Sequence, residues 1–219
     1  MSLLGIIGGT GFASLDTVRI TRQQVHQTPY GPTSGPLIRG SLAGREVVFL
    51  PRHGSPHAIP PHRINYRANI RALRDIGVDS IIGINAVGGI TERMAPRAIV
   101  IPDQIIDYTW SREHSYWNDG DSEVIHVDFT RPYSDGLRGR ILDAAARLGL
   151  GLIGSGTYGA TQGPRLETAA EIARMERDGC DIVGMTGMPE AALARELALD
   201  YASISLVVNM AAGKTDAEI

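Results

Sequence analysis

The chain has 219 residues, 43% of them hydrophobic and 21% charged, and its formal net charge at pH 7 is −3. This length and composition predict a substantial core within one domain spanning residues 1–219. The negative charge argues against a nucleic acid or a membrane surface as the main partner and favours a small molecule. A single cysteine excludes an intramolecular disulfide, and no apolar run approaches the ~18 residues of a membrane-spanning helix, so we expect a cytoplasmic protein.

Short apolar runs alternate with helical patterns along the chain. Strands are predicted at residues 3–7, 47–50, 80–84, 98–101, 181–185 and 202–208. Helices are predicted at residues 66–73, 137–148, 168–177 and 189–197. The alternation predicts the α/β class, with a mixed, twisted sheet flanked by helices. The polar and aromatic segment 108–128 is expected to be a long functional or interface loop.

Positive charge is concentrated in residues 51–74, which contain arginines and histidines but no carboxylate before Asp75. Arg52 and His53 directly follow the predicted strand 47–50. In an open α/β sheet, ligands bind at the carboxyl ends of the strands. We therefore predict an oxyanion site, for phosphate, with Arg52 supplying a forked donor. A solvated helix face is the alternative.

Other predicted strands also end in glycine or polar residues. These residues are Gly8, Gly9 and Thr10, then Asn85 and Ala86, then Met185 and Thr186, and finally Asn209. Glycines after a strand let backbone N–H groups approach an anion, although a tight turn explains the first group equally well. Together, these ends at one edge of a sheet predict a pocket.

Several common types of site are not supported. A dinucleotide fingerprint starting at Gly9 continues with Gly11 but has Ser14 in place of the third glycine. No glutamate follows His53 as a zinc protease motif requires, so we expect no metal. There is no GxSxG motif, and Cys180 has no histidine near it in sequence. The lack of a nucleophile favours a reaction in which a group of the substrate is transferred directly onto a bound acceptor.

The blocks GIIGGTGF, RHG followed by PPHRINYRANIRAL, NAVGGI, TQGPRLETAAEI and GMTGMPEAALARE cover nearly the whole chain. Together they resemble the trimeric branch of purine nucleoside phosphorylases and 5'-methylthioadenosine phosphorylases. The resemblance implies the nucleoside phosphorylase fold, a homotrimer or dimer of trimers, inorganic phosphate as co-substrate and no cofactor. The phosphate contacts it implies are Thr10, Arg52, His53, Ala86 through its backbone, and Thr186. The nucleoside contacts it implies are Asn85, His57, Leu166, Met185, Met210 and Ala211, with His126 lent to the sugar of a neighbouring subunit.

The purine end departs from the methylthioadenosine enzymes, which resemble this chain elsewhere but carry aspartates at the positions of Asn209 and Ala211 and a serine near Glu167. Asn209 has a donor and an acceptor, so it can donate to a 6-oxo group and accept from a protonated imidazole-ring nitrogen. Glu167 can accept from the pyrimidine-ring N–H of hypoxanthine. A strand-end turn for Asn209 and a helix cap for Glu167 are the alternatives.

The expected reaction is phosphorolysis of S-methyl-5'-thioinosine to hypoxanthine and 5-methylthioribose 1-phosphate, with Asn209 and Glu167 as the catalytic residues. Methylthioadenosine, or inosine and guanosine, remain alternative substrates, and a non-catalytic nucleotide-binding protein is an alternative from another class. The chain ends soon after NMAAGK, where the family continues with a further helix. We therefore expect either an additional C-terminal segment or an unusually open pocket.

Overall fold

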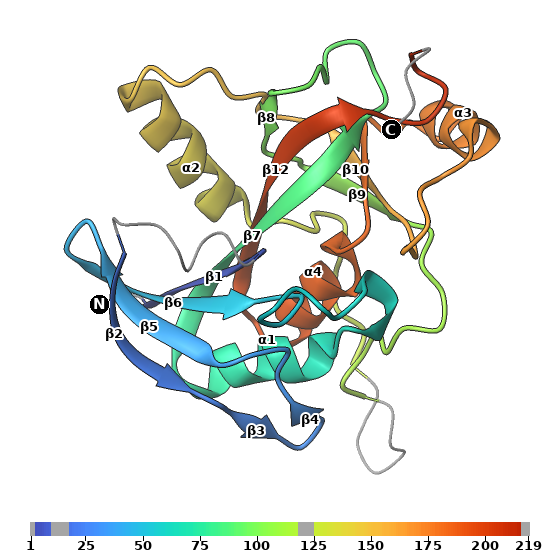
Figure 1. The fold of residues 1–219 in the computed structure, drawn as a ribbon. Helices are drawn as coiled ribbons and strands as arrows, with labels where there is room; N and C mark the ends of the chain where they lie inside the picture. The colour runs from blue at the N-terminus through green and yellow to red at the C-terminus, as the bar shows by residue number, and fades with distance from the viewer. Residues whose placement is uncertain (1–2, 10–17, 118–124, 216–219) are drawn as a thin grey trace.

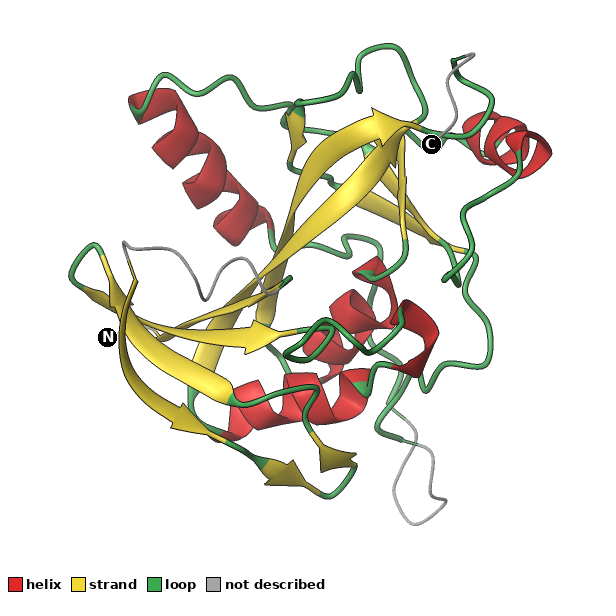
Figure 2. Ribbon diagram, viewed as in Figure 1, coloured by secondary structure: helices red, strands yellow, loops and turns green. Residues whose placement is uncertain are grey.

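A computed structural model of the chain describes residues 3–9, 18–117 and 125–215 (Figure 1). Within these residues, ten strands form one mixed sheet in the order β2-β5-β6-β1-β7-β11-β10-β9, with β12 beside β7 and β8 beside β12. Helices α1 and α4 pack together against the sheet, whereas α2 lies beside β12 and α3 lies near the end of the described chain (Figure 2). The predicted class, a mixed sheet flanked by helices, is confirmed.

The strands of this sheet are β1 (Leu3–Gly8), β2 (Val18–Gln24), β5 (Leu37–Leu42), β6 (Arg45–Pro51), β7 (Val78–Gly89), β8 (Ile99–Val100), β9 (Gln104–Asp107), β10 (Thr157–Ala160), β11 (Ile182–Gly184) and β12 (Asp200–Met210). A two-stranded sheet pairs β3 (Gln27–Thr28) with β4 (Gly31–Pro32). The helices are the 3-10 helix η2 (Pro61–Arg63) and the α-helices α1 (Tyr66–Asp75), α2 (Asp135–Arg147), α3 (Ala169–Arg177) and α4 (Gly187–Glu196).

Strand β7 organises the sheet because three other strands pair with it. Strand β1 runs parallel to its first half, β12 runs parallel along most of its length, and β11 runs antiparallel to its last residues. Figure 1 shows β7 and β12 as two long strands crossing the molecule side by side. Because it is flanked on both edges, β7 is mostly buried and gives neighbouring strands a fixed register.

The predicted strand 80–84 extends to Gly89, and the predicted strand 202–208 extends to Met210. Asn85, Ala86 and Asn209 therefore lie within strands and do not follow them. The glycine that ends β7 allows close packing, since a Cβ on Gly89 would overlap the Met94 carbonyl oxygen.

Several strands are not predicted from the sequence, including β2, β5, β9 and β10. Strand β2 reads VRITRQQ, and its described side chains are exposed, so it lacks the apolar pattern that predicts a strand. The expected loop is confirmed where it is described, since residues 108–117 and 125–128 contain no helix or strand.

Candidate active site

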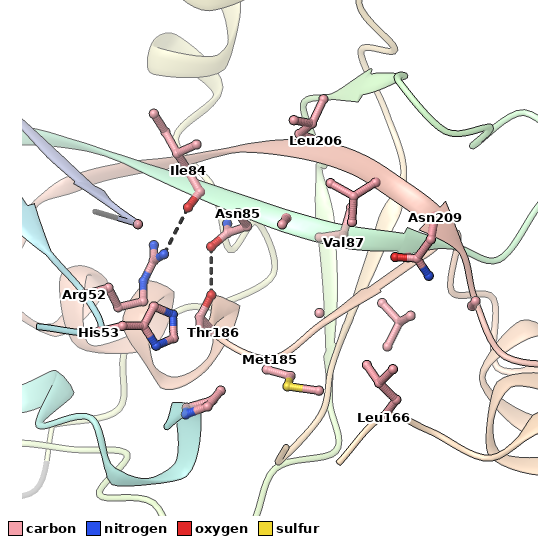
Figure 3. Close-up of a pocket in the computed structure, with 18 of the residues that line it drawn as sticks. Arg52, His53, Ile84, Asn85, Val87, Leu166, Met185, Thr186, Leu206 and Asn209 are labelled. Carbon is pink, nitrogen blue, oxygen red and sulfur yellow. Dashed lines mark hydrogen bonds between the residues drawn. The ribbon is translucent and has the colours of Figure 1, made fainter. Parts of the chain in front are cut away.

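A cavity of about 530 Å³ lies along the C-terminal half of β7. The predicted site residues that line it are Arg52, His53, His57, Asn85, Ala86, Leu166, Glu167, Met185, Thr186, Asn209 and Ala211. Met210 and His126 are not among the described lining residues, and Thr10 lies outside the described part of the chain. Figure 3 shows Arg52, His53 and Thr186 at one end, Leu166 and Asn209 at the other, and Met185 between them.

The first end, which we call the arginine end, consists of Arg52, His53, Asn85 and Thr186. Strand register explains why residues so far apart in sequence meet here. Strand β11 is antiparallel to β7, with Val183 opposite Gly88. Continuing this register past the end of β11 brings Thr186 opposite Asn85, and Thr186 Oγ1 donates to Asn85 Oδ1 at 2.8 Å (Figure 3).

A chain of buried polar groups supports this contact from behind. Asn85 Nδ2 donates to Ser203 Oγ at 2.7 Å, and the hydroxyls of Ser203 and Ser205 are 3.0 Å apart. Asn85 is only 4% exposed, so its amide mainly orients Thr186. Neither serine is predicted as a site residue from the sequence, although their spacing of two on the apolar strand β12 places them on the same face.

The guanidinium fork of Arg52 is engaged by Glu190 of α4. Arg52 Nε and Nη2 donate to the two Glu190 carboxylate oxygens at 2.8 and 2.9 Å. Arg52 Nη1 donates to the Ile84 carbonyl at 3.0 Å, and Nη2 donates to the Ile7 carbonyl at 3.3 Å. Among the described contacts, this leaves one Nη1 hydrogen for a ligand. The fork thus binds a protein carboxylate, whereas the sequence pattern predicts that it faces an anion in the pocket.

Both charges of this ion pair are shielded from solvent, because Arg52 is 2% exposed and Glu190 is fully buried. Desolvation alone would lower the pKa of Arg52, but the Glu190 charge and hydrogen bond outweigh it and hold the pKa above its usual value. The Tyr201 hydroxyl donates to Glu190 Oε1 at 2.8 Å. Glu190 was not predicted as a site residue; its one sequence signal is an acidic residue within the otherwise apolar run of residues 187–194.

His53 is held in one tautomer. Its Nδ1 lies 2.9 Å from the Ile59 carbonyl oxygen, which can only accept, so Nδ1 carries the hydrogen. The ring stacks on His57 with centroids 4.2 Å apart. Burial lowers the pKa of His53 below 6.5, the bond to Ile59 opposes this, and the charge of Arg52 adds to it. His53 is therefore mainly neutral at pH 7, with Nε2 as an acceptor.

The second end, which we call the asparagine end, consists of Leu166, Glu167, Asn209 and Ala211. In the parallel pairing of β12 with β7, Val207 lies opposite Val87 and Asn209 opposite Gly88, so the register shifts at a bulge. Because Gly88 is three residues beyond Asn85, the two ends are separated by about 10 Å along the strand.

The polar groups of the asparagine end are partly engaged by the protein itself. Asn209 Nδ2 donates to the Met210 carbonyl at 2.7 Å, which fixes the amide orientation and leaves a second N–H hydrogen and Oδ1 for a ligand. Glu167 Oε1 accepts from Thr161 Oγ1 at 2.6 Å, which leaves Oε2 as a further acceptor. This end therefore offers one donor and two acceptors within a mainly apolar lining.

Across the described residues, no group of three or more His, Cys, Asp or Glu side chains is arranged to hold a metal ion. The described helices also include none with the length and apolar character needed to cross a membrane.

Comparison with known proteins identifies the family. The family model described as the phosphorylase superfamily matches residues 3–219. The chain belongs to this superfamily. A relative from Xanthomonas campestris pv. campestris, named a probable S-methyl-5'-thioinosine phosphorylase, is 54% identical over 217 residues, which cover 98% of this chain and 86% of the relative.

More distant members of the phosphorylase superfamily extend the comparison. The 6-oxopurine nucleoside phosphorylase of Pyrococcus furiosus is 46% identical over 218 residues, covering 97% of this chain and 81% of that protein. Among solved structures, the apo form of methylthioadenosine phosphorylase from Schistosoma mansoni superposes with a TM-score of 0.93 at 33% identity, covering 98% of this chain and 83% of that one.

The environment of His53 predicts that the stability of the folded protein depends on pH. In the unfolded chain its pKa is near 6.5, and burial lowers it in the folded protein. Below pH 6.5, His53 therefore binds a proton more readily in the unfolded chain than in the folded protein. As a result, the contribution of His53 to the free energy of unfolding falls as pH decreases from 6.5 toward the folded pKa. NMR titration should give a His53 pKa below 6.5, and His53→Gln should flatten the dependence of stability on pH in this window.

His57→Gln is the matched control, because burial, and not the neighbouring ring, is the main cause of the shift. The lowered pKa of His53 should persist in that variant. A His53 that titrates at or above 6.5 in the folded wild type would contradict the interpretation.

Proposed function

We propose that this chain is an S-methyl-5'-thioinosine phosphorylase, which uses inorganic phosphate to produce hypoxanthine and 5-methylthioribose 1-phosphate. The observation that carries the proposal is a single cavity with phosphate-type ligands at one end and 6-oxopurine-type ligands about 10 Å away along β7. The 54% identity to a relative of that name supports it. The proposed enzyme is cytoplasmic, takes part in purine and methylthio-nucleoside salvage, and needs no cofactor.

Phosphate is proposed to bind at the arginine end. Its ligands are Thr10, the remaining Nη1 hydrogen of Arg52, the backbone of Ala86 and the hydroxyl of Thr186. Neutral His53 offers Nε2 as an acceptor, which suits the O–H of hydrogen phosphate. Since the Thr186 hydroxyl has one hydrogen, it must turn from Asn85 Oδ1 to donate to phosphate.

In the reaction, a phosphate oxygen forms a bond to the anomeric carbon as the N-glycosidic bond breaks, and the bonding electron pair leaves with the purine. The ribosyl ring gains oxocarbenium character, which the adjacent phosphate dianion stabilises. Met185, between the two ends, is proposed to pack on the sugar, with His57 and Asn85 nearby. The leaving purine anion takes up a proton from solvent on its imidazole ring, which gives neutral hypoxanthine.

The base is proposed to bind at the asparagine end. Asn209 donates to the 6-oxygen and accepts from the protonated imidazole ring, and Glu167 Oε2 accepts from the pyrimidine-ring N–H. Leu166, Met210 and Ala211 complete this end by resemblance to the family. A carboxylate at position 209 would set its lone pairs against those of a 6-oxo group, so asparagine favours hypoxanthine over adenine. Inosine or guanosine is the second candidate substrate, because a relative named for 6-oxopurine nucleosides is 46% identical.

The first prediction of this proposal is phosphate dependence. Purified protein treated with EDTA should release hypoxanthine from methylthioinosine only when phosphate is added. Thr186→Val keeps the shape of the side chain but removes the hydroxyl, so it should raise the KM for phosphate by about tenfold, in line with a lost hydrogen bond to a charged group. The KM for the nucleoside should change little.

Thr186→Ser, which restores the hydroxyl, should return the KM for phosphate close to the wild-type value. Equal release of hypoxanthine without phosphate would refute the phosphorylase assignment.

The second prediction concerns the base. A panel of methylthioinosine, methylthioadenosine, inosine and adenosine, each with phosphate, should show the highest kcat/KM for methylthioinosine. Asn209→Asp should shift the ratio of specificity constants toward methylthioadenosine, because the new carboxylate accepts from a 6-amino group. The double variant with Ala211→Asp should shift it further. A wild-type preference for methylthioadenosine would instead support the alternative substrate.

The third prediction concerns assembly, which we propose is a homotrimer with shared active sites. His126 is exposed and lies outside the cavity of its own chain, which fits a residue lent to a neighbour. Mixing His126→Ala with Asn209→Ala would then create some pockets with both wild-type side chains. After subunit exchange, verified by mass spectrometry, turnover should exceed the average of the separate variants; a monomer, or turnover no higher than that average, would exclude sharing through these residues.

A further inference from the structure

Arg112 lies in the loop that follows β9 and does not line the cavity, yet its guanidinium binds two segments that do. The Nη2 group donates to the carbonyl oxygens of Thr161 and Gln162 at 3.0 and 2.7 Å. The Nη1 group donates to the carbonyl oxygens of Met185 and Met188 at 2.8 and 2.6 Å. Each of the two terminal nitrogens of the guanidinium therefore binds one of the segments.

Two further contacts fix the orientation of the guanidinium. Arg112 Nε donates to Gln162 Oε1 at 3.0 Å, and the same oxygen accepts from the Trp110 backbone N–H at 3.2 Å. Arg112 also lies over the Tyr66 ring, 5.4 Å from its centroid, and Nη1 is 3.2 Å from the Tyr66 hydroxyl oxygen. In the described part of the chain, all of its hydrogen-bond acceptors are neutral, and four of them are backbone carbonyls.

The two segments begin where the sheet ends. Strands β10 and β11 pair in parallel up to Ala160 and Gly184, and the N–H of Thr161 makes a further bond to the Gly184 carbonyl at 2.8 Å. Beyond this point, the carbonyls need other donors, since buried backbone groups must be paired. Arg112 supplies these donors and holds the two segments together after their ladder has stopped.

Each segment leads to one end of the cavity. The segment from Thr161 leads to Leu166 and Glu167, and Thr161 also donates to Glu167 at 2.6 Å. The segment from Met185 contains Thr186 of the arginine end. We propose that Arg112 is a positioning residue that fixes the base-binding end relative to the phosphate-binding end, an inference that rests on the proposed function.

Only an arginine fits this role, because its planar fork presents donors to both sides in a fixed geometry. A lysine would keep the charge but would concentrate its donors at one point on a flexible stem. A methionine of similar length would leave the four carbonyls without these donors.

Arg138 of α2 provides a matched control. It also donates to backbone carbonyls, through Nε to Pro102 at 2.9 Å and through Nη2 to Gly154 at 2.6 Å, and its side chain is 12% exposed. Neither Arg138 nor these partners line the cavity. Replacing it therefore removes a carbonyl-binding arginine, together with its ion pair to Asp135 at 3.7 Å, without touching the two segments.

The experiment compares wild type, Arg112→Met, Arg112→Lys and Arg138→Met by steady-state kinetics, thermal unfolding and hydrogen–deuterium exchange. Arg112→Met should lower kcat, at saturating phosphate and nucleoside, by about 100-fold, the usual effect of misplacing reacting groups by about 1 Å. Amide exchange should accelerate in both segments, residues 161–167 and 185–188. Arg112→Lys should show a smaller loss, and Arg138→Met should keep the wild-type kcat and slow exchange in these segments even where its melting temperature falls.

A kcat for Arg112→Met equal to that of Arg138→Met, or unchanged exchange in the two segments, would overturn the inference. Should Arg112→Met not fold, Arg112→Lys decides by the same two measurements, with a wild-type kcat and unchanged exchange counting against the role. Failure of the proposed function can be told apart from failure of this inference. A wild type without phosphate-dependent turnover would refute the function, while the exchange comparison would still test whether Arg112 holds the two segments together.

Discussion

The buried ion pair between Arg52 and Glu190 holds the structure together around the cavity. It joins the end of β6 to helix α4, while the same guanidinium binds carbonyls of β1 and β7. The Tyr201 hydroxyl extends the contact to β12. Removing one partner of such a pair typically costs about 3–5 kcal/mol, because the other charge stays buried and uncompensated. The arrangement of these strands is therefore tied to a charge pair next to the arginine end, so that folding and site assembly depend on the same contact.

Sequence patterns were sufficient to locate much of the site because the cavity lies along strands with strong apolar signals. Arg52 and His53 were predicted correctly to follow β6, and Asn85, Thr186 and Asn209 were predicted to converge. The strand arrangement that the sequence predicts as the cause of this convergence is only partly right. The sequence predicts that the site residues follow strands that end at one edge of the sheet, whereas β11 runs antiparallel to β7, and the site residues of β7 and β12 lie within those strands.

The remaining features depend on tertiary packing that local patterns do not contain. Glu190 lies 138 residues from Arg52 in sequence, so nothing near either residue indicates that the fork is occupied by a protein carboxylate. The role of Arg112 is equally hidden, since an arginine in a polar loop usually faces solvent. The reason for a glycine at the end of β7 is likewise not visible in sequence, because close backbone approach and a tight turn both call for glycine, and only the neighbouring Met94 carbonyl distinguishes them.

The register along β7 also bears on how substrate preference diverges. The two ends of the cavity are set by different neighbours of this one strand: the segment that follows β11 brings Thr186 to Asn85, and the bulge in β12 places Asn209 opposite Gly88. In the proposed function, changes at positions 209 and 211 would therefore alter which groups meet a nucleobase without shifting the distant anion ligands. A few substitutions at the asparagine end can in this way change which purine serves as the leaving group during evolution, while the residues of the arginine end are inherited unchanged.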